Sequence, residues 1–167
     1  MKGTMKNTIK AILCVLLTAT LSAAMLAHAS PAEIELPFRG SLRGVLEIQG
    51  VQFPTLFAVG NDTGNATHLG RFAAEWEEEV NLITNAGIGS GQFVAANGDR
   101  LFNDFTGQAT PTGTPNQVTV EVSAIITGGT GRFAGASGSF IEQLWVDLGA
   151  GLTAGYIEGT IAFTKEK

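Results

Sequence analysis

Apolar and polar residues alternate with a period of two over most of the chain after position 34. In 117–127, alternate positions carry Val, Val, Val, Ala and Ile, and the positions between them carry mostly Thr, Glu and Ser. In 153–164, Ile157 and Ile161 share one face, and Glu158 lies on the other. This period is typical of β-strands that have one buried face and one face in water.

Eight such runs follow one another, and turns rich in Gly, Asn, Asp and Thr separate most of them. We expect strands at 34–48, 51–60, 66–79, 89–96, 100–108, 117–127, 133–148 and 153–164. Asn97-Gly98 fits a tight hairpin turn, because both residues tolerate a positive φ. The segment 75–79 could also form a helical turn, but Phe72 and Trp76 keep the period of two, so we interpret it as a strand. Without strong helical periodicity, the pattern predicts a sandwich or a barrel.

The N-terminus has the pattern of a secretory signal peptide. Lys2, Lys6 and Lys10 precede an apolar run over 11–26, and Ala27-His28-Ala29 follows as a small-x-small site. We therefore predict a signal helix in residues 1–29, cleavage after Ala29, and a mature domain of residues 30–167 that is secreted or periplasmic. The apolar run is shorter than the ~20 residues that a membrane-spanning helix needs. We expect no stable membrane insertion after cleavage.

Cleavage changes the charge and the cysteine count. The whole chain has 10 basic and 15 acidic residues, a net charge of −5 and one cysteine, Cys14, which lies in the predicted signal peptide. The mature domain of 138 residues would keep seven basic and all fifteen acidic residues, for a net charge of −8. It would lack disulfides and the usual four-ligand zinc site. The acidic balance argues against binding to nucleic acid, and nothing in the sequence points to a metal or a cofactor.

The run I-T-G-G-T-G-R-F-A-G-A-S-G-S-F at 126–140 resembles the Gly-rich hairpin of the allene oxide cyclase-like and dirigent-like barrels. In those families, G-G-T-G-[KR]-F followed by a small-residue A-x-G joins two long strands of an eight-stranded antiparallel barrel. The chain is also similar to uncharacterised secreted bacterial proteins that combine this hairpin with segments like 66–72 and 95–99. The resemblance implies an all-β, calycin-type single barrel, and with the form of the N-terminus it implies a bacterial source.

The same Gly-rich run could be compared with a phosphate-binding loop. That loop needs G-x-x-x-x-G-K-[ST] before a helix, whereas no Lys-Ser or Lys-Thr follows Gly131 and the next segment alternates like a strand. We expect instead a tight turn with a positive φ at one or more glycines.

His68 is the only histidine of the predicted mature domain. It has the same strand parity as Phe72 and Trp76, so we expect it to point inward. As a catalytic candidate, His68 would need a carboxylate partner, and the alternative is a structural histidine held by hydrogen bonds. The partners we consider are Asp62, Glu75 and Asp104.

Glu142 is the second catalytic candidate. By parity it shares a face with Phe140 and Leu144 and lies opposite Trp145. A carboxyl group inside an apolar pocket would have a raised pKa and could act as an acid or a base. The alternative is a strand end that is open to water.

Four further residues are candidates for ligand binding. Arg71 and Arg100 could anchor an anion, or each could pair with a nearby acid. Trp76 and Trp145 could lie at the rim of a pocket or pack in the core. The acidic residues of 75–79 could form a cation-binding lip, but we favour a solvated strand end.

The sequence leaves three classes of function open. We favour a non-enzymatic exported barrel that binds a small apolar or aromatic ligand or a surface partner, because the pattern predicts an apolar interior and contains no nucleophile motif. The resemblance implies an alternative, a cyclase, an isomerase or a dirigent-like guide for reactive intermediates. None of the families' catalytic residues lies in the hairpin that matches. The third alternative is a structural protein that forms a homo-oligomer through its outer face.

Overall fold

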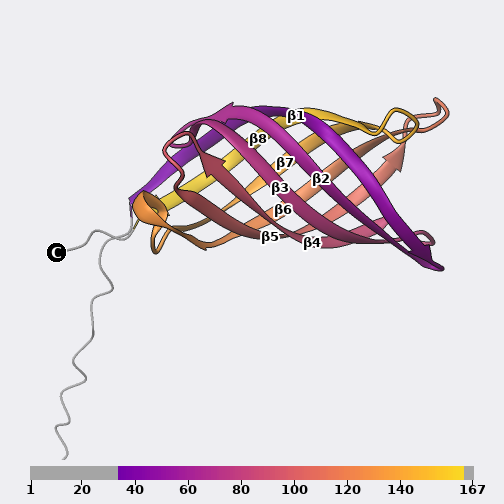
Figure 1. Ribbon diagram of the computed structural model, residues 1–167, viewed down its shortest axis with the longest axis horizontal. Coiled ribbons are helices and arrows are strands. Elements are labelled where there is room, and N and C mark those ends of the chain that lie inside the picture. The colour runs from indigo at the N-terminus through magenta and orange to yellow at the C-terminus, as the bar shows by residue number, and fades with distance from the viewer. Residues whose placement is uncertain (1–33, 164–167) are drawn as a thin grey trace, which may run out of the picture. The chain divides into compact units, whose positions relative to one another are not determined.

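The computed structural model describes residues 34–163, and the predicted signal peptide with its cleavage site after Ala29 lies outside them. The described chain folds into eight strands and one short 3-10 helix, η1 (Figure 1). The elements are β1 (Ile34–Gln52), β2 (Thr55–Ala66), β3 (Gly70–Asn81), β4 (Ala86–Ala95), β5 (Arg100–Pro111), β6 (Gln117–Gly129), η1 (Gly131–Phe133), β7 (Ser137–Asp147) and β8 (Leu152–Phe163). No helix among these residues is long and apolar enough to cross a membrane.

The strands form a closed antiparallel barrel. Each strand pairs with the next along the chain, and β8 pairs with β1 to complete the ring. Closure gives the backbone groups at both sides of every strand a partner, so no long sheet edge remains exposed. The prediction of a single eight-stranded antiparallel barrel is confirmed.

The strand limits differ most from the expected ones around β2 and β3. We expected one strand to end at 60 and the next to begin at 66, but β2 continues to Ala66 and β3 begins at Gly70. The polar stretch 61–65 resembles a loop in composition, yet each of its residues is paired with both β1 and β3. The barrel supplies both hydrogen-bonding neighbours, and this outweighs the low strand propensity of Asn, Asp and Gly.

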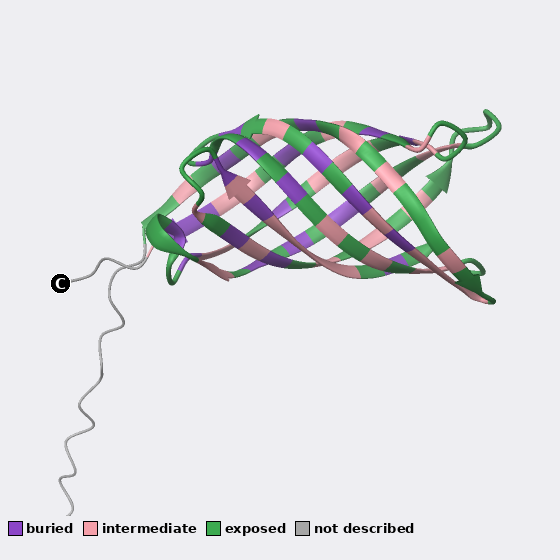
Figure 2. Cartoon of the chain, in the orientation of Figure 1, coloured by how far each residue is buried: buried purple, intermediate pink, exposed green. Residues whose placement is uncertain are grey.

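Burial alternates most regularly along β3, β5 and β6, as the period of two predicted (Figure 2). The inward residues at one end of the barrel fill it with aromatic rings. Phe93 packs edge-on against Phe38, Phe72 and Phe140, at centroid distances of 6.3, 5.1 and 5.8 Å. Edge-to-face contacts at this spacing are favourable for aromatic pairs. This end of the barrel, the closed end, is therefore a solid core.

The Gly-rich run 126–140 covers the closed end. It leaves β6, forms η1 and enters β7, with Gly131 at φ +54°. The side chain of Phe133 is fully buried, and the backbone N–H of Arg132 donates to a carboxylate oxygen of Asp99 at 3.2 Å. The run is thus the turn with a positive φ that we expected between two long strands, but the second strand begins at Ser137 and not at 133, because η1 precedes it.

Candidate functional site

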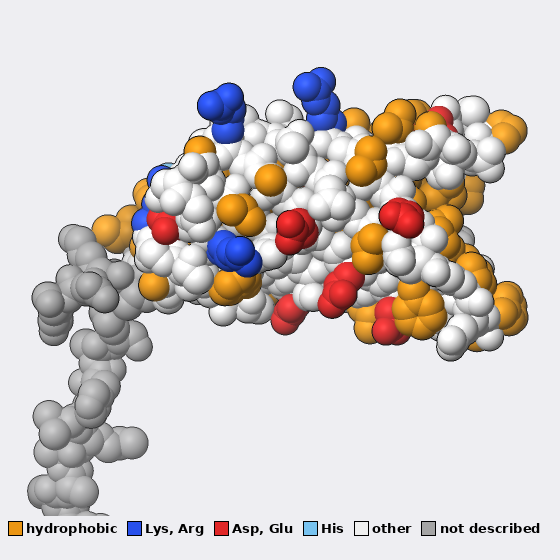
Figure 3. Space-filling view, viewed as in Figure 1, with side chains coloured by type: hydrophobic (Ala, Val, Ile, Leu, Met, Phe, Trp, Pro, Cys, Tyr) orange, Lys and Arg blue, Asp and Glu red, His pale blue; other side chains and the backbone are white. Residues whose placement is uncertain are grey.

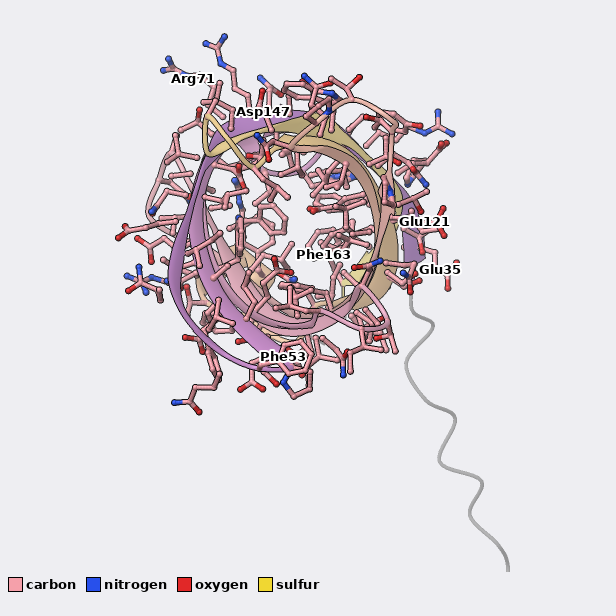
Figure 4. All side chains as sticks on the ribbon, turned by 90° about the vertical axis from the view of Figure 1, so that its right-hand side faces the viewer. Glu35, Phe53, Arg71, Glu121, Asp147 and Phe163 are labelled. Carbon is pink, nitrogen blue, oxygen red and sulfur yellow. The ribbon has the colours of Figure 1, made fainter. Side chains whose placement is uncertain are left out.

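The opposite end of the barrel, the mouth, is open. The hairpin turns at 52–55, 81–86, 111–117 and 147–152 surround it, and Figure 4 looks into it with Phe53 and Asp147 at the rim. A cavity of about 200 Å³ extends inward from the mouth toward the aromatic core. Its wall is largely apolar and includes Leu46, Leu56, Val80, Val120, Leu144 and Val146.

The rim of the mouth is also apolar. Phe53 and Ile83, at the tips of two hairpins, are 76 % and 68 % exposed, and Leu148 at a third is also exposed. Figure 3 shows hydrophobic side chains gathered at this end of the barrel. Apolar side chains concentrated around the entrance of an apolar cavity are a feature of ligand-binding sites.

Polar groups gather in the depth of the cavity, around Asp62. This buried carboxylate on β2 accepts a hydrogen bond from the indole Nε1–H of Trp76 on β3, at 2.6 Å. Its other oxygen accepts one from the hydroxyl of Thr153 on β8, at 2.5 Å. Hydrogen bonds to a charged acceptor are stronger than neutral ones, so the three side chains form a fixed polar group inside an apolar lumen.

Two inward-facing glycines make room for this group. Gly44 on β1 lies between Asp62 and Thr153, since it is the cross-strand partner of both residues. A Cβ at Gly44 would collide with the Asp62 carboxylate and with the backbone of Asn61. Gly60 pairs with Trp76, and a Cβ there would collide with the indole ring. The small residues on β1 and β2 therefore let Trp76 and Thr153 reach Asp62.

Glu142 faces the same cavity from β7, as its parity predicted. Its cross-strand partners are Val122 and Ile157, both buried and apolar. Among the residues that the structure describes, none makes a hydrogen bond or an ion pair with Glu142. Burial, together with the negative charge of Asp62, raises its pKa to about 8. At neutral pH, Glu142 is therefore mostly the uncharged acid.

Two more carboxyl groups of the cavity have raised pKa values. Burial raises the pKa of Asp62, and the hydrogen bonds from Thr153 and Trp76 oppose this rise by stabilising the anion. Burial also raises the pKa of Glu78, which faces inward from β3. The cavity therefore combines an apolar wall with three acids of unusual pKa, and such groups are found often at functional sites.

The expectation that His68 points into the barrel is wrong, whereas the alternative of a structural histidine held by a hydrogen bond agrees with its position. His68 lies in the turn between β2 and β3 with a φ of +66°, and it is exposed at the closed end. Its Nε2 lies 3.2 Å from the carbonyl oxygen of Pro37, and its ring packs against Phe163. The alternation is interrupted in the turn, where Leu69 is buried instead of His68. His68 therefore does not share a site with Glu142.

The four ligand-binding candidates separate into one residue of the cavity and three of the outer surface. Trp76 lines the cavity and binds Asp62. Trp145 faces outward and is 39 % exposed. Arg71 is exposed at the start of β3, and Arg100 donates on the outer surface to the side-chain oxygen of Gln92 at 3.0 Å. Neither arginine reaches the cavity.

The acidic run of β3 divides between the two faces of the strand. Glu75, Glu77 and Glu79 are exposed outside the barrel, and Glu78 points into the lumen. Within residues 34–163, no three metal-ligating side chains are grouped closely enough to hold a metal ion. The run is a strand throughout, as we interpreted it, rather than a helical turn.

Sequence reasoning missed two residues of the site. Asp62 was considered only as a partner for His68, because the predicted strand ended before it, and Thr153 was not considered. A signal for Asp62 was present, since it has the parity of the inward residues Leu56 and Ala58. No sequence signal joins Thr153 to Asp62, because their contact depends on the closure of the barrel between β8 and β1.

The comparisons with known proteins are limited to structure. No protein-family model matches the chain, and no curated protein matches it. A solved structure of a pterocarpan synthase dirigent protein is similar, with a TM-score of 0.56 and 14 % identity over 81 % of this chain and 88 % of that one. At this identity, the likeness concerns the fold alone. Residues 34–163 have the fold of a dirigent-like eight-stranded barrel, as the Gly-rich hairpin suggested.

Proposed function

We propose that the barrel binds a small ligand with an apolar or aromatic body in the cavity at its mouth. The observation that carries this proposal is the cavity itself, which is apolar along its wall, polar in its depth and open to solvent. Pockets of this composition are the usual sites for small molecules. Binding requires only this cavity, whereas catalysis would require a reacting group as well, so we place binding first.

The volume of the cavity limits the ligand. About 200 Å³ is below the ~300 Å³ at which pockets for drug-sized molecules begin. It exceeds the ~150 Å³ that is enough to bind benzene in an apolar cavity. A ligand with one ring and a short chain fits these limits, and a longer one would project through the mouth.

Trp76 provides a direct test, because it lines the cavity and the chain has only one other tryptophan, the outward-facing Trp145. In a Trp145→Phe variant, we expect propylbenzene to shift the emission of Trp76 and the shift to saturate at one equivalent. In the matched Trp76→Phe variant, the emission of Trp145 should not change. Absence of a shift in the first variant, together with absence of heat in calorimetry, would contradict binding in the cavity.

A second candidate function is catalysis by proton transfer, of the cyclase or isomerase type. It is favoured by Glu142, a neutral acid at pH 7, in the same cavity as Asp62. The two carboxyl groups have different surroundings, because Asp62 accepts two hydrogen bonds and Glu142 accepts none from the described residues. Such a pair fits proton transfer within one substrate. The similar solved structure is of a dirigent protein named as a pterocarpan synthase, which supports chemistry in barrels of this fold.

This second candidate is tested by following the conversion of small phenolic substrates. We expect Glu142→Gln to remove the conversion, because the amide cannot donate the proton and take it back. A conversion that Glu142→Gln retains in full would contradict the assignment of Glu142. His68→Ala serves as the control, since His68 lies outside the cavity.

We also propose that the domain is exported and can associate through its outer wall. Export rests on the N-terminal pattern, and the sequence of the exported protein should begin at Ser30.

The proposed association rests on the exposed apolar residues Ile125, Ile141 and Tyr156 of β6, β7 and β8. Light scattering should then show an oligomer, and a monomer at high concentration would contradict it.

A further inference from the structure

Every ionisable side chain that lines the cavity from inward positions of the barrel is a carboxylic acid. Asp62, Glu78 and Glu142 come from β2, β3 and β7. The basic side chains of residues 34–163, which are five arginines and His68, are all exposed. Acids enclosed in an apolar surrounding are unfavourable unless a positive charge or hydrogen bonds compensate them. The barrel itself supplies no positive charge to this cavity.

The carboxyl group of Glu142 is available to a ligand. Every fully buried side-chain oxygen or nitrogen of the described residues has a hydrogen-bond partner, whereas Glu142 has none. Its oxygens must therefore reach the space of the cavity. Asp62 has capacity as well, because a carboxylate offers about four acceptor positions and two hydrogen bonds are present, from Trp76 and Thr153.

We infer that the occupant of this cavity is a small organic ammonium ion, with its apolar body against the lumen wall and its positive charge beside Asp62 and Glu142. The inference rests on the proposed binding function and names the chemical class of the ligand. An organic cation fits better than a metal ion, because the acids of residues 34–163 do not form a metal-sized group. The apolar wall would also remain unused by a bare ion.

The outer surface carries charges of the matching sign. Four of the five described arginines, Arg39, Arg71, Arg100 and Arg132, lie toward the closed end of the barrel. Figure 3 shows basic side chains on that half of the face in view. Exposed acids lie in both halves of the barrel. Those near the mouth, such as Glu77 and Glu79, are not accompanied by these four arginines, so the surface there is more negative. A field of this direction attracts cations to the entrance and raises their association rate.

Binding of a cation should release a proton. Glu142 is mostly neutral at pH 7, and an ammonium group beside it would favour the ionised form. Its neighbours on β6 and β8, Val122 and Ile157, carry no charge. Within residues 34–163, the other titratable side chains that face the lumen are those of Asp62 and Glu78. The affinity should therefore rise about tenfold between pH 7 and pH 9.

Three probes that share a phenyl ring and a two-carbon linker separate charge from apolar binding. Propylbenzene is neutral, 2-phenylethylamine is positive and 3-phenylpropionate is negative, and alkylamines stay charged to about pH 9. Calorimetry at pH 8.5 should give a dissociation constant for the amine about tenfold lower than that of propylbenzene, which corresponds to ~1.4 kcal/mol. The carboxylate should bind more weakly than propylbenzene. The heat of binding of the amine should also depend on the ionisation enthalpy of the buffer, as proton release requires.

Variants assign the effect to Glu142. In Glu142→Gln, the ratio of the two dissociation constants should fall toward one. The dependence of amine binding on pH should become weaker, with any remainder coming from Asp62 and Glu78. Glu47→Gln is the matched control, because Glu47 is exposed on the outer face of β1, and the ratio should persist. Equal binding of propylbenzene and the amine, or tighter binding of propylbenzene, would overturn the ammonium inference while apolar binding stands. Failure of all three probes to bind would contradict both.

Discussion

At the scale of single residues, the two carboxyl groups of Asp62 and Glu142 differ in the hydrogen bonds that they receive. Asp62 receives two hydrogen bonds, which stabilise its anion. Glu142 receives none from the described residues and lies between Val122 and Ile157. Asp62 is thus held in place by the protein. The protonation of Glu142 depends on pH and on what occupies the lumen.

The raised pKa of Glu142 predicts that the protein loses stability as pH rises. The folded protein holds this proton up to about pH 8, whereas the unfolded chain releases it near pH 4.5. The folded state therefore binds more protons between these values, and the free energy of unfolding must fall across this window and level off above pH 8. The slope from one such group approaches ~1.4 kcal/mol per pH unit.

Urea unfolding at several pH values measures this slope. We expect Glu142→Gln to make it shallower, with a remainder from Asp62 and Glu78, whose pKa values are also raised. Glu47→Gln, an exposed position on β1, should retain the wild-type slope. A wild-type stability that is constant from pH 5 to pH 8 would show that Glu142 is ionised in the folded protein.

At the scale of strands, the period of two placed most inward residues correctly, including Trp76 and Glu142. The period of two placed His68 wrongly. The inward residues of β2 and β3 are all even-numbered, so the pattern runs through the turn between them, and the sequence does not show that a turn is there. Asp62 escaped prediction for a related reason, since a polar stretch such as 61–65 resembles a loop when its neighbours are unknown. In the barrel, β1 and β3 supply those neighbours on both sides.

The contact between Asp62 and Thr153 could not be predicted from a local pattern at all. These residues are 91 positions apart, and the contact exists only because β8 closes onto β1 and Gly44 leaves the space between them. Local patterns contain information on which face of a strand a residue occupies. They contain little on which strands meet, and this is why the resemblance at 126–140 was needed to choose a barrel over a sandwich.

The substitution Gly44→Ala tests the packing between the strands. Gly44→Ala would drive a methyl group into the backbone of Asn61 and the carboxylate of Asp62, and we expect it to lower the free energy of unfolding by about 3 kcal/mol. The emission of Trp76 should change as well, because Asp62 would move away from the indole N–H. Urea unfolding and fluorescence of the Trp145→Phe background measure the two effects.

Gly50→Ala is the matched control for Gly44→Ala. It lies on the same strand, has no positive φ, and a Cβ there would meet no atom within 4 Å. Its effect on unfolding should stay within ~0.5 kcal/mol. Equal effects of the two substitutions would mean that the loss comes from glycine itself and not from the space beside Asp62.

At the scale of the whole barrel, the solid core and the proposed binding cavity lie at opposite ends. Aromatic rings and the Gly-rich turn fill the closed end, where Phe38, Phe133 and Leu101 are fully buried. The mouth half contains the cavity, the acids and the exposed rim. Because a solid core at one end supplies the burial that folding needs, the other end can remain open without loss of the fold.

This separation predicts that changes at the two ends have different consequences. Phe133→Ala removes a fully buried ring at the closed end, away from the cavity, and should lower the free energy of unfolding by about 3–5 kcal/mol. The protein that remains folded should keep its affinity for the probe that the cavity binds.

Val120→Phe adds a ring to the half-buried cavity wall near the mouth. It should weaken binding of the probe about tenfold or more, while the free energy of unfolding changes by less than ~1.5 kcal/mol. Urea unfolding and calorimetry on both variants measure the four quantities. A loss of affinity in Phe133→Ala as large as that in Val120→Phe would show that the closed end shapes the cavity, and that the two ends act as one unit.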